Sequence, residues 1–259
     1  MTILLNPTLG LTEENKKRVQ RLVTHGFDET DLSAHPTNRI AAVLVLLYQD
    51  PEEDNTLRVL LTTRAKHLRT HAGQTALPGG RMDEADGRDP VTAAFREANE
   101  ETCLPLPPHR DIHVLCTLEP HLSLHTLLVI PVIALLTHPN PQLFIEQTLK
   151  PSPNEVSRIF SHPLRALLDP GRYLGKDMER LAERGSEDWI YDTELHHTTD
   201  SPHGPLHLYR NHRFRSTGSP IKGLTSDILI KTASIAYSQT PSYERCVLGF
   251  FGSRRRALE

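Results

Sequence analysis

Three glutamates lie close together in the segment Arg96-Glu97-Ala98-Asn99-Glu100-Glu101. On a helix each residue turns about 100°, so Glu97, Glu100 and Glu101, at positions i, i+3 and i+4, lie on neighbouring parts of one face. Like charges at this spacing destabilise a helix by roughly a few tenths of a kcal/mol per pair. A divalent cation would turn them into a ligand set, and hard oxygen donors suit Mg²⁺ or Mn²⁺ better than zinc. The alternative interpretation is a solvated acidic face, which describes most charge runs.

The segment before these glutamates favours the metal-binding interpretation. Leu77-Pro78-Gly79-Gly80 precedes an acidic turn that contains Asp83, Glu84 and Asp86. Glycine allows the backbone to adopt positive φ or to approach a ligand closely. A Gly-Gly pair alone usually marks a turn. Two glycines, an acidic loop and then Arg-Glu-x-x-Glu-Glu on a helix form a much rarer combination.

The pattern of apolar residues indicates the elements that hold this helix. Val91, Phe95 and Ala98 form an apolar face on a helix expected from about 91 to 102. The run from Ile40 to Tyr48 is typical of a strand buried on both faces. We also expect strands at 57–62, 112–118 and 126–135, a partly helical segment at 154–168, and a closing helix at 223–237.

These elements predict a single domain over residues 1–259, with its core at about 38–240. An N-terminal helix is expected at 12–23, where Thr12 can act as the N-cap. Residues from about 170 to 220 are the least regular and are interpreted as a decoration, with short strands at 189–191 and 206–209. The histidines from His196 to His212 lack the spacing of a known metal site.

The composition limits the classes of function. The chain has 259 residues, a net charge of −3 and a hydrophobic fraction of 37%, which are ordinary values for a globular protein. This charge argues against a nucleic-acid partner. The longest apolar stretch, 127–136, is too short for a membrane span and contains Pro131. Three cysteines without a CxxC motif favour an intracellular protein, with cytoplasm, peroxisome and mitochondrion left open.

The segment from Gly80 to Leu104 resembles the Nudix box, whose pattern is G-x5-E-x7-R-E-U-x-E-E-x-G-U. The positions in register are Arg96, Glu97, Glu100, Glu101 and Leu104. Three positions depart from the pattern. Asp86 replaces the first glutamate, the gap from Asp86 to Arg96 is two residues longer, and Cys103 replaces the glycine. For Cys103 we expect that the thiol fills a small apolar space.

A second motif resembles the signature of Nudix coenzyme A diphosphatases, L-L-T-x-R-[SA]-x3-R-x3-G-x3-F-P-G-G. It is carried by Leu60-Leu61-Thr62-Thr63-Arg64-Ala65, Arg69, Gly73 and Pro78-Gly79-Gly80, and Leu77 takes the place of the phenylalanine. Gly223-Leu224-Thr225 resembles the C-terminal element of the same subfamily, although Lys222 replaces its aromatic residue. The resemblance covers about residues 38–165 well and 221–237 moderately.

The resemblance implies a Nudix fold, an α/β/α sandwich with a mixed β-sheet. It also implies that Glu97, Glu100 and Glu101 hold Mg²⁺ or Mn²⁺, and that Arg96 forms an ion pair with a glutamate of the box and orients it. The metal would lower the pKa of a water that attacks one phosphorus of a diphosphate. Gly79 and Gly80 would let the backbone approach the substrate.

The resemblance also indicates candidates for the general base and for the residues that bind the substrate phosphates. The general base is Glu100, Glu101 or Glu155, which lies in a loop that carries a functional glutamate in many Nudix proteins. An alternative for Glu155 is an acidic residue at a helix N-terminus. Arg64 and Arg69 are interpreted as ligands of substrate phosphates, because arginine makes bidentate contacts with such groups.

Three functions are compatible with these patterns. The first is hydrolysis of coenzyme A or acyl-CoA to 3′-phospho-AMP and (acyl-)phosphopantetheine. The second is a Nudix hydrolase of another nucleotide or prenyl diphosphate. The third is a catalytically inactive Nudix domain that acts as a binding module, although a dead domain gains nothing from three repelling carboxylates. A homodimer is compatible with each of them.

Overall fold

The computed structural model describes residues 10–26, 32, 35–123, 126–203 and 207–246. Within these residues the main sheet has the strand order β3-β2-β1-β7-β5; β4 pairs with β1, β6 with β7 and β8 with β2. Only β1 and β7 are parallel, so the sheet is mixed. The strands are β1 (Ile40–Asp50), β2 (Thr56–Arg64), β3 (Thr75–Ala76), β4 (Gly79–Arg81), β5 (Ile112–Thr117), β6 (His121–Leu122), β7 (Leu128–Leu136) and β8 (Val156–Pro163).

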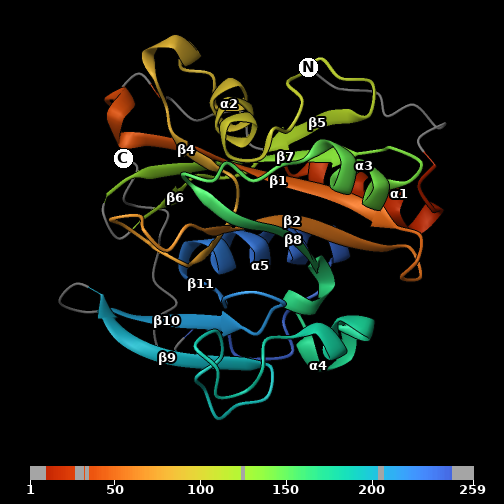
Figure 1. Ribbon diagram of the computed structural model, residues 1–259, viewed down its shortest axis with the longest axis vertical. Coiled ribbons are helices and arrows are strands. Elements are labelled where there is room, and N and C mark those ends of the chain that lie inside the picture. The colour runs from red at the N-terminus through yellow and green to blue at the C-terminus, as the bar shows by residue number, and fades with distance from the viewer. Residues whose placement is uncertain (1–9, 27–31, 33–34, 124–125, 204–206, 247–259) are drawn as a thin grey trace.

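Helices cover both faces of this sheet (Figure 1). Helices α2 (Pro90–Thr102) and α3 (Pro141–Thr148) pack on one face, and α1 (Glu13–Thr24) and α5 (Gly223–Tyr237) pack on the other. The short helix α4 (Pro170–Tyr173) follows β8 through a 3₁₀ turn, η3 (Leu164–Leu167). The expected α/β/α sandwich with a mixed sheet is therefore confirmed, and so are the helices expected at 12–23, 91–102 and 223–237.

Strand β1 explains why two separate cores form. Its side chains alternate between the faces, as the strand period of two requires. Ile40, Ala42 and Leu44 pack with α2, whereas Val45 and Leu47 pack with α1 and α5. A strand with apolar residues on both faces must lie inside the sheet, between β2 and β7. No helix among the described residues is long and apolar enough to cross a membrane.

The segment 154–168 was expected to be partly helical, but most of it is a strand and only its end is a 3₁₀ helix. It forms strand β8, which pairs with β2, and then η3. Val156, Phe160, Leu164 and Leu167 recur at helical spacing and are buried. The edge of β2 supplies backbone partners for residues 156–163, however, and this pairing overrides the local pattern.

The expectation of an irregular decoration at 170–220 is also wrong in part. This region contains β9 (His196–His203) and β10 (His207–Phe214), which form a second sheet with β11 (Ile221–Lys222) in the order β11-β10-β9. The strand expected at 206–209 is the start of β10, although Leu206 lies outside the described residues. No strand forms at 189–191. Trp189 lies in a turn, where its fully buried indole donates a hydrogen bond to the carbonyl oxygen of Thr193 at 2.8 Å.

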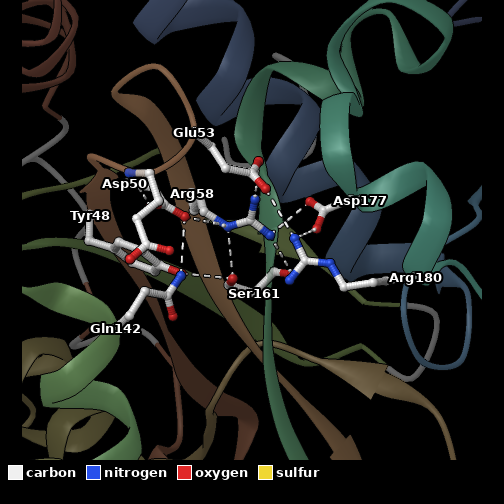
Figure 2. A network of polar contacts seen from close by, with 9 residues as sticks. Tyr48, Asp50, Glu53, Arg58, Gln142, Ser161, Asp177 and Arg180 are labelled. Atoms are coloured by element: carbon white, nitrogen blue, oxygen red, sulfur yellow. Dashed lines mark hydrogen bonds and ion pairs between the residues drawn. The ribbon is translucent and has the colours of Figure 1, made fainter.

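A buried arginine ties the start of this region to the main sheet (Figure 2). Arg58, on β2, contacts Asp177 at 2.8 Å and Glu53 at 3.0 Å, and its Nε donates to Ser161 Oγ at 2.9 Å. Arg180 bridges the same two carboxylates at 3.0 and 3.1 Å. Because Asp177 and Arg180 belong to the 3₁₀ segment η4 (Gly175–Arg180), the network fixes the chain that leads to the second sheet.

Candidate active site

Helix α2 starts and packs in a way that fixes its acidic face. Asp89 caps the helix by accepting hydrogen bonds from the backbone N–H groups of Val91 and Thr92, and Pro90 occupies the first turn. Phe95 and Ala98 are buried against the main sheet. The side of the helix that flanks this apolar face therefore carries the glutamates, as the sequence predicts.

Two glycines allow strand β4 to lie directly beside this helix. A Cβ on Gly80 would lie 2.4 Å from Glu97 Cδ, so only glycine leaves room for that carboxylate. Gly79 has a φ of +148°, and a Cβ there would lie 2.4 Å from the carbonyl oxygen of Ala42. The backbone N–H of Gly79 donates to Glu101 Oε2 at 3.2 Å. The two glycines thus contact the two carboxylates, which makes them part of the site's framework.

Arg96 is the main cationic group among the carboxylates of the box. Its Nε and Nη2 donate to the two oxygens of Asp86 at 2.8 and 2.9 Å. Its Nη1 donates to Glu97 at 3.1 Å and to Glu100 at 3.3 Å. The hydrogen bonds from Arg96 lower the pKa of Asp86, and the same bonds raise the pKa of Arg96. Its strongest partner is therefore Asp86, in addition to the box glutamates that the resemblance implies.

Asp86 organises the loop before α2. The gap from Asp86 to Arg96 is two residues longer than in the Nudix box pattern. Residues Glu84–Asp86 form a 3₁₀ turn, η2, and Asp86 Oδ2 accepts a hydrogen bond from the backbone N–H of Asp83 at 2.7 Å. Asp86 is 3% exposed. An aspartate can therefore replace the longer glutamate because the additional residues of the loop bring its backbone to Arg96.

Glu101 is a buried carboxylate and Glu97 a partly buried one, and burial makes the ionised form of each less stable. Burial raises the pKa of Glu97, although Arg96 opposes this effect. Burial also raises the pKa of Glu101 to about 8, opposed by the Gly79 N–H and by Arg64. The negative charges of Glu97 and Glu155 raise it further. Each carboxylate thus makes the ionised form of the other less stable.

Glu100 differs from the other two glutamates. Its side chain is 53% exposed, and its carboxylate is paired with Arg96. In the residues that the structure describes, no three His, Cys, Asp or Glu side chains are gathered into a ready set of metal ligands. Oxygen donors are nevertheless what Mg²⁺ and Mn²⁺ require, and a cation would relieve the repulsion between Glu97 and Glu101. The residues therefore fit a divalent cation.

Backbone hydrogen bonds bring Glu155 and Arg64 to the end of α2. The N–H of Ser152 donates to the carbonyl oxygen of Glu101 at 2.9 Å, and the N–H of Ala65 donates to that of Glu155 at 2.8 Å. Arg64 Nη1 lies 3.8 Å from Glu101 Oε1. Glu155 precedes strand β8, so the alternative of a helix N-terminus is wrong. Sequence reasoning missed Ser152 and the backbone role of Ala65, because backbone groups leave no side-chain signal.

Arg69 is not brought together with these residues. It is exposed on the loop between β2 and β3, and within the described part of the chain its side chain forms no hydrogen bond or ion pair. The predicted site residues thus form one group, consisting of Arg64, Gly79, Gly80, Arg96, Glu97, Glu100, Glu101 and Glu155, while Arg69 lies apart from it on a flanking loop.

Cys103 corrects the expectation for the glycine position of the box. The residue is exposed, so its thiol does not fill an apolar space. It ends helix α2 in the left-handed conformation, with a φ of +57°, and its N–H donates to the carbonyl oxygen of Asn99 at 2.8 Å. Glycine suits such a helix end because it has no Cβ to strain the backbone. The requirement at this position is conformational.

Comparisons with known proteins agree with this geometry. The NUDIX domain family model matches residues 38–180. "Nudix hydrolase 15, mitochondrial" from Arabidopsis thaliana is 37% identical over 85% of this chain and 69% of its own length. "Nudix hydrolase 22, chloroplastic" from the same plant is 34% identical over 88% of this chain and 66% of its own. The chain spans about two thirds of each relative. The crystal structure of RenU, a Nudix hydrolase from M. smegmatis, is 24% identical over 51% of this chain and 74% of its own, with a TM-score of 0.39.

The chain therefore belongs to the Nudix hydrolase family. Its helix α2 is the helix of the Nudix box, and the α/β/α sandwich is the Nudix fold. Enzymes of this family generally depend on divalent cations, which agrees with the chemistry of the carboxylates described above.

We expect the Cys103→Gly variant to be more stable than the natural protein. A non-glycine residue in the left-handed region costs about 1–2 kcal/mol, and part of this cost is returned by the larger entropy of glycine in the unfolded chain. The melting temperature should rise by about 2–4 °C in a thermal unfolding experiment. The Cys103→Ala variant is the control, because it removes the thiol and keeps the Cβ. An equal rise for both variants would contradict the conformational explanation.

The stability of the metal-free protein should depend on pH through Glu101. Its pKa in the folded protein, about 8, lies above its ordinary value of 4.5. The associated stability is therefore fully present below about pH 4.5 and is lost as pH rises through about 8. Glu101→Gln stays neutral at every pH. In EDTA, we expect the melting temperature of the variant minus that of the natural protein to increase from about pH 5 to about pH 9. A constant difference would show that Glu101 is already ionised at low pH.

Proposed function

We propose that this Nudix hydrolase cleaves the diphosphate bond of coenzyme A or acyl-CoA, giving 3′-phospho-AMP and (acyl-)phosphopantetheine. The observation that carries the proposal is the position of Arg64, an arginine of the coenzyme A diphosphatase signature. Its guanidinium lies 3.8 Å from Glu101, and its buried Nε has no hydrogen-bond partner in the described part of the chain. The Arg64 side chain is 26% exposed, and this exposed part is available to an anionic substrate.

The departure at Leu77 does not weaken the proposal. Its side chain is 4% exposed and belongs to the core cluster beneath α5. Leucine in place of phenylalanine at this position therefore changes core packing. The neighbouring Gly79 and Gly80 retain their close contacts with the carboxylates.

Each residue of the site would have its own role in the reaction. Glu97 and Glu101, with Glu100 at the exposed side, would hold Mg²⁺ or Mn²⁺, which neutralises the diphosphate oxygens and lowers the pKa of a water when bound. Asp86 holds Arg96, and Arg96 orients Glu97 and Glu100. Glu100, Glu101 and Glu155 are the three candidates for the general base, of which Glu101 is buried and the other two are exposed.

The second candidate is hydrolysis of another nucleotide or prenyl diphosphate, which would use the same carboxylates with a different substrate pocket. The third is a binding module without activity. An intracellular setting stays a prediction, supported by the free cysteines Cys103, Cys116 and Cys246.

The test is to incubate the purified protein with coenzyme A and Mg²⁺ or Mn²⁺ and to identify the products by mass spectrometry. We expect 3′-phospho-AMP and phosphopantetheine, and no product in EDTA. Glu101→Gln should reduce turnover by more than about 100-fold, since even partners of metal ligands are worth about 10–100-fold. The matched control is Glu84→Gln, which changes an exposed glutamate of the acidic loop before α2. This variant should retain full turnover.

A panel of nucleotide and prenyl diphosphates separates the alternatives. Hydrolysis of one of these compounds without hydrolysis of coenzyme A would contradict the proposed substrate and favour the second candidate. An absence of turnover for every compound, with the protein folded, would favour the binding module.

A further inference from the structure

Three basic residues lie in one row across the second sheet. The register pairs His197 of β9 with Arg213 of β10, and Arg213 with Lys222 of β11. Directly opposed residues on neighbouring strands project from the same face, so the three side chains are neighbours. All three are partly buried. Because positive charges placed opposite each other destabilise a sheet, this row requires an explanation.

Two other arginines, one on β10 and one just after it, have carboxylate partners. Arg210 forms a bidentate pair with Asp200, with both distances 2.8 Å. Arg215, which follows the strand, contacts Glu194 at 3.1 Å. In the part of the chain that the structure describes, Arg213 forms no ion pair with a carboxylate. Of these three arginines, the one without a carboxylate partner is therefore Arg213, which is paired with Lys222 in the sheet register.

The positive charges of the row are oriented but not neutralised. Arg213 donates to Thr199 Oγ1 at 2.8 Å, and its guanidinium lies 5.5 Å from the ring centre of Tyr191. Tyr191 in turn stacks on His197 at 4.3 Å. Among the described residues, the ammonium of Lys222 has no hydrogen bond or ion pair. Burial lowers the pKa of Lys222, and the charge of Arg213 lowers it further.

The end of the row on β11 belongs to a strand next to the segment that carries the coenzyme A diphosphatase signature. Strand β11 packs beside β3, and Thr75 of β3 donates a hydrogen bond to the carbonyl oxygen of Ser219 at 2.6 Å. Lys66, in the loop that follows β2, forms an ion pair with Glu187. That ion pair joins the signature loop to a turn four residues before Tyr191.

We propose that His197, Arg213 and Lys222 bind a phosphate monoester of the substrate that is not hydrolysed, such as the 3′-phosphate of coenzyme A. A phosphate dianion would compensate the two permanent charges of the row, and arginine can meet it with two parallel hydrogen bonds. The choice of this particular phosphate rests on the proposed function. Lys222 occupies the position before Gly223, where the similar subfamily has an aromatic residue, so the subsite is a property of this chain.

The test compares the binding of 3′-phospho-AMP and AMP to the full-length protein by calorimetry, which does not depend on turnover. We expect the natural protein to bind 3′-phospho-AMP at least about tenfold more tightly, the effect of one good charged contact. Lys222→Gln and Arg213→Gln should each reduce this preference at least about fivefold, whereas Lys222→Arg should retain it. Lys231→Gln, which changes a lysine of α5, is the matched control and should bind as the natural protein does.

Two results would overturn the proposal. One is a natural protein without the preference, or with a preference that survives both substitutions. The other is binding of inorganic phosphate that depends on Lys222 without any preference for 3′-phospho-AMP, because the row would then bind a separate anion. If Arg213→Gln fails to fold, Lys222→Gln decides, since Lys222 lies at the end of a two-residue strand. A preference that depends on Lys222 in a protein that does not hydrolyse coenzyme A would support this subsite and reject the proposed function.

Discussion

The close approach of helix α2 to strand β4 is the constraint on which the site depends. Gly80 has no side chain where the carboxylate of Glu97 lies, and the backbone of Gly79 donates to Glu101. Strand β4 can occupy this position because it pairs with β1, which is fixed at the centre of the sheet by apolar residues on both faces. The carboxylates of Glu97 and Glu101 are therefore positioned by backbone contacts with the interior of the fold.

This arrangement stores an electrostatic cost in the folded protein. The charge of the partly buried Glu97 raises the pKa of the buried Glu101, and Arg96 is held mainly by Asp86. A divalent cation would relieve the cost, so affinity for the cation and stability of the protein are linked. The second sheet contains a similar imbalance of opposite sign at Arg213 and Lys222. In the proposed function, a cation would compensate the first imbalance and a phosphate of the substrate the second.

The sequence predicts the parts of this account that are local. The spacing of Glu97, Glu100 and Glu101, the apolar face of their helix and the continuous apolar run of β1 each lie within about a dozen residues. Strand β8 was missed because its spacing is helical and its partner β2 is about 100 residues away. The row that ends at Lys222 depends on strand register, which a single sequence does not specify. The role of Cys103 depends on a positive φ that its side chain disfavours.

In the proposed cation site, Glu97 and Glu101 hold the ion and Glu100 supports it from the exposed side. Titration of Mn²⁺ into the natural protein and its glutamate variants, followed by electron paramagnetic resonance, measures the contribution of each glutamate. We expect Glu97→Gln and Glu101→Gln each to weaken Mn²⁺ binding by at least about tenfold, and Glu100→Gln to weaken it less. Loss of Mn²⁺ binding in Glu100→Gln, with unchanged affinity in Glu101→Gln, would contradict the proposed site.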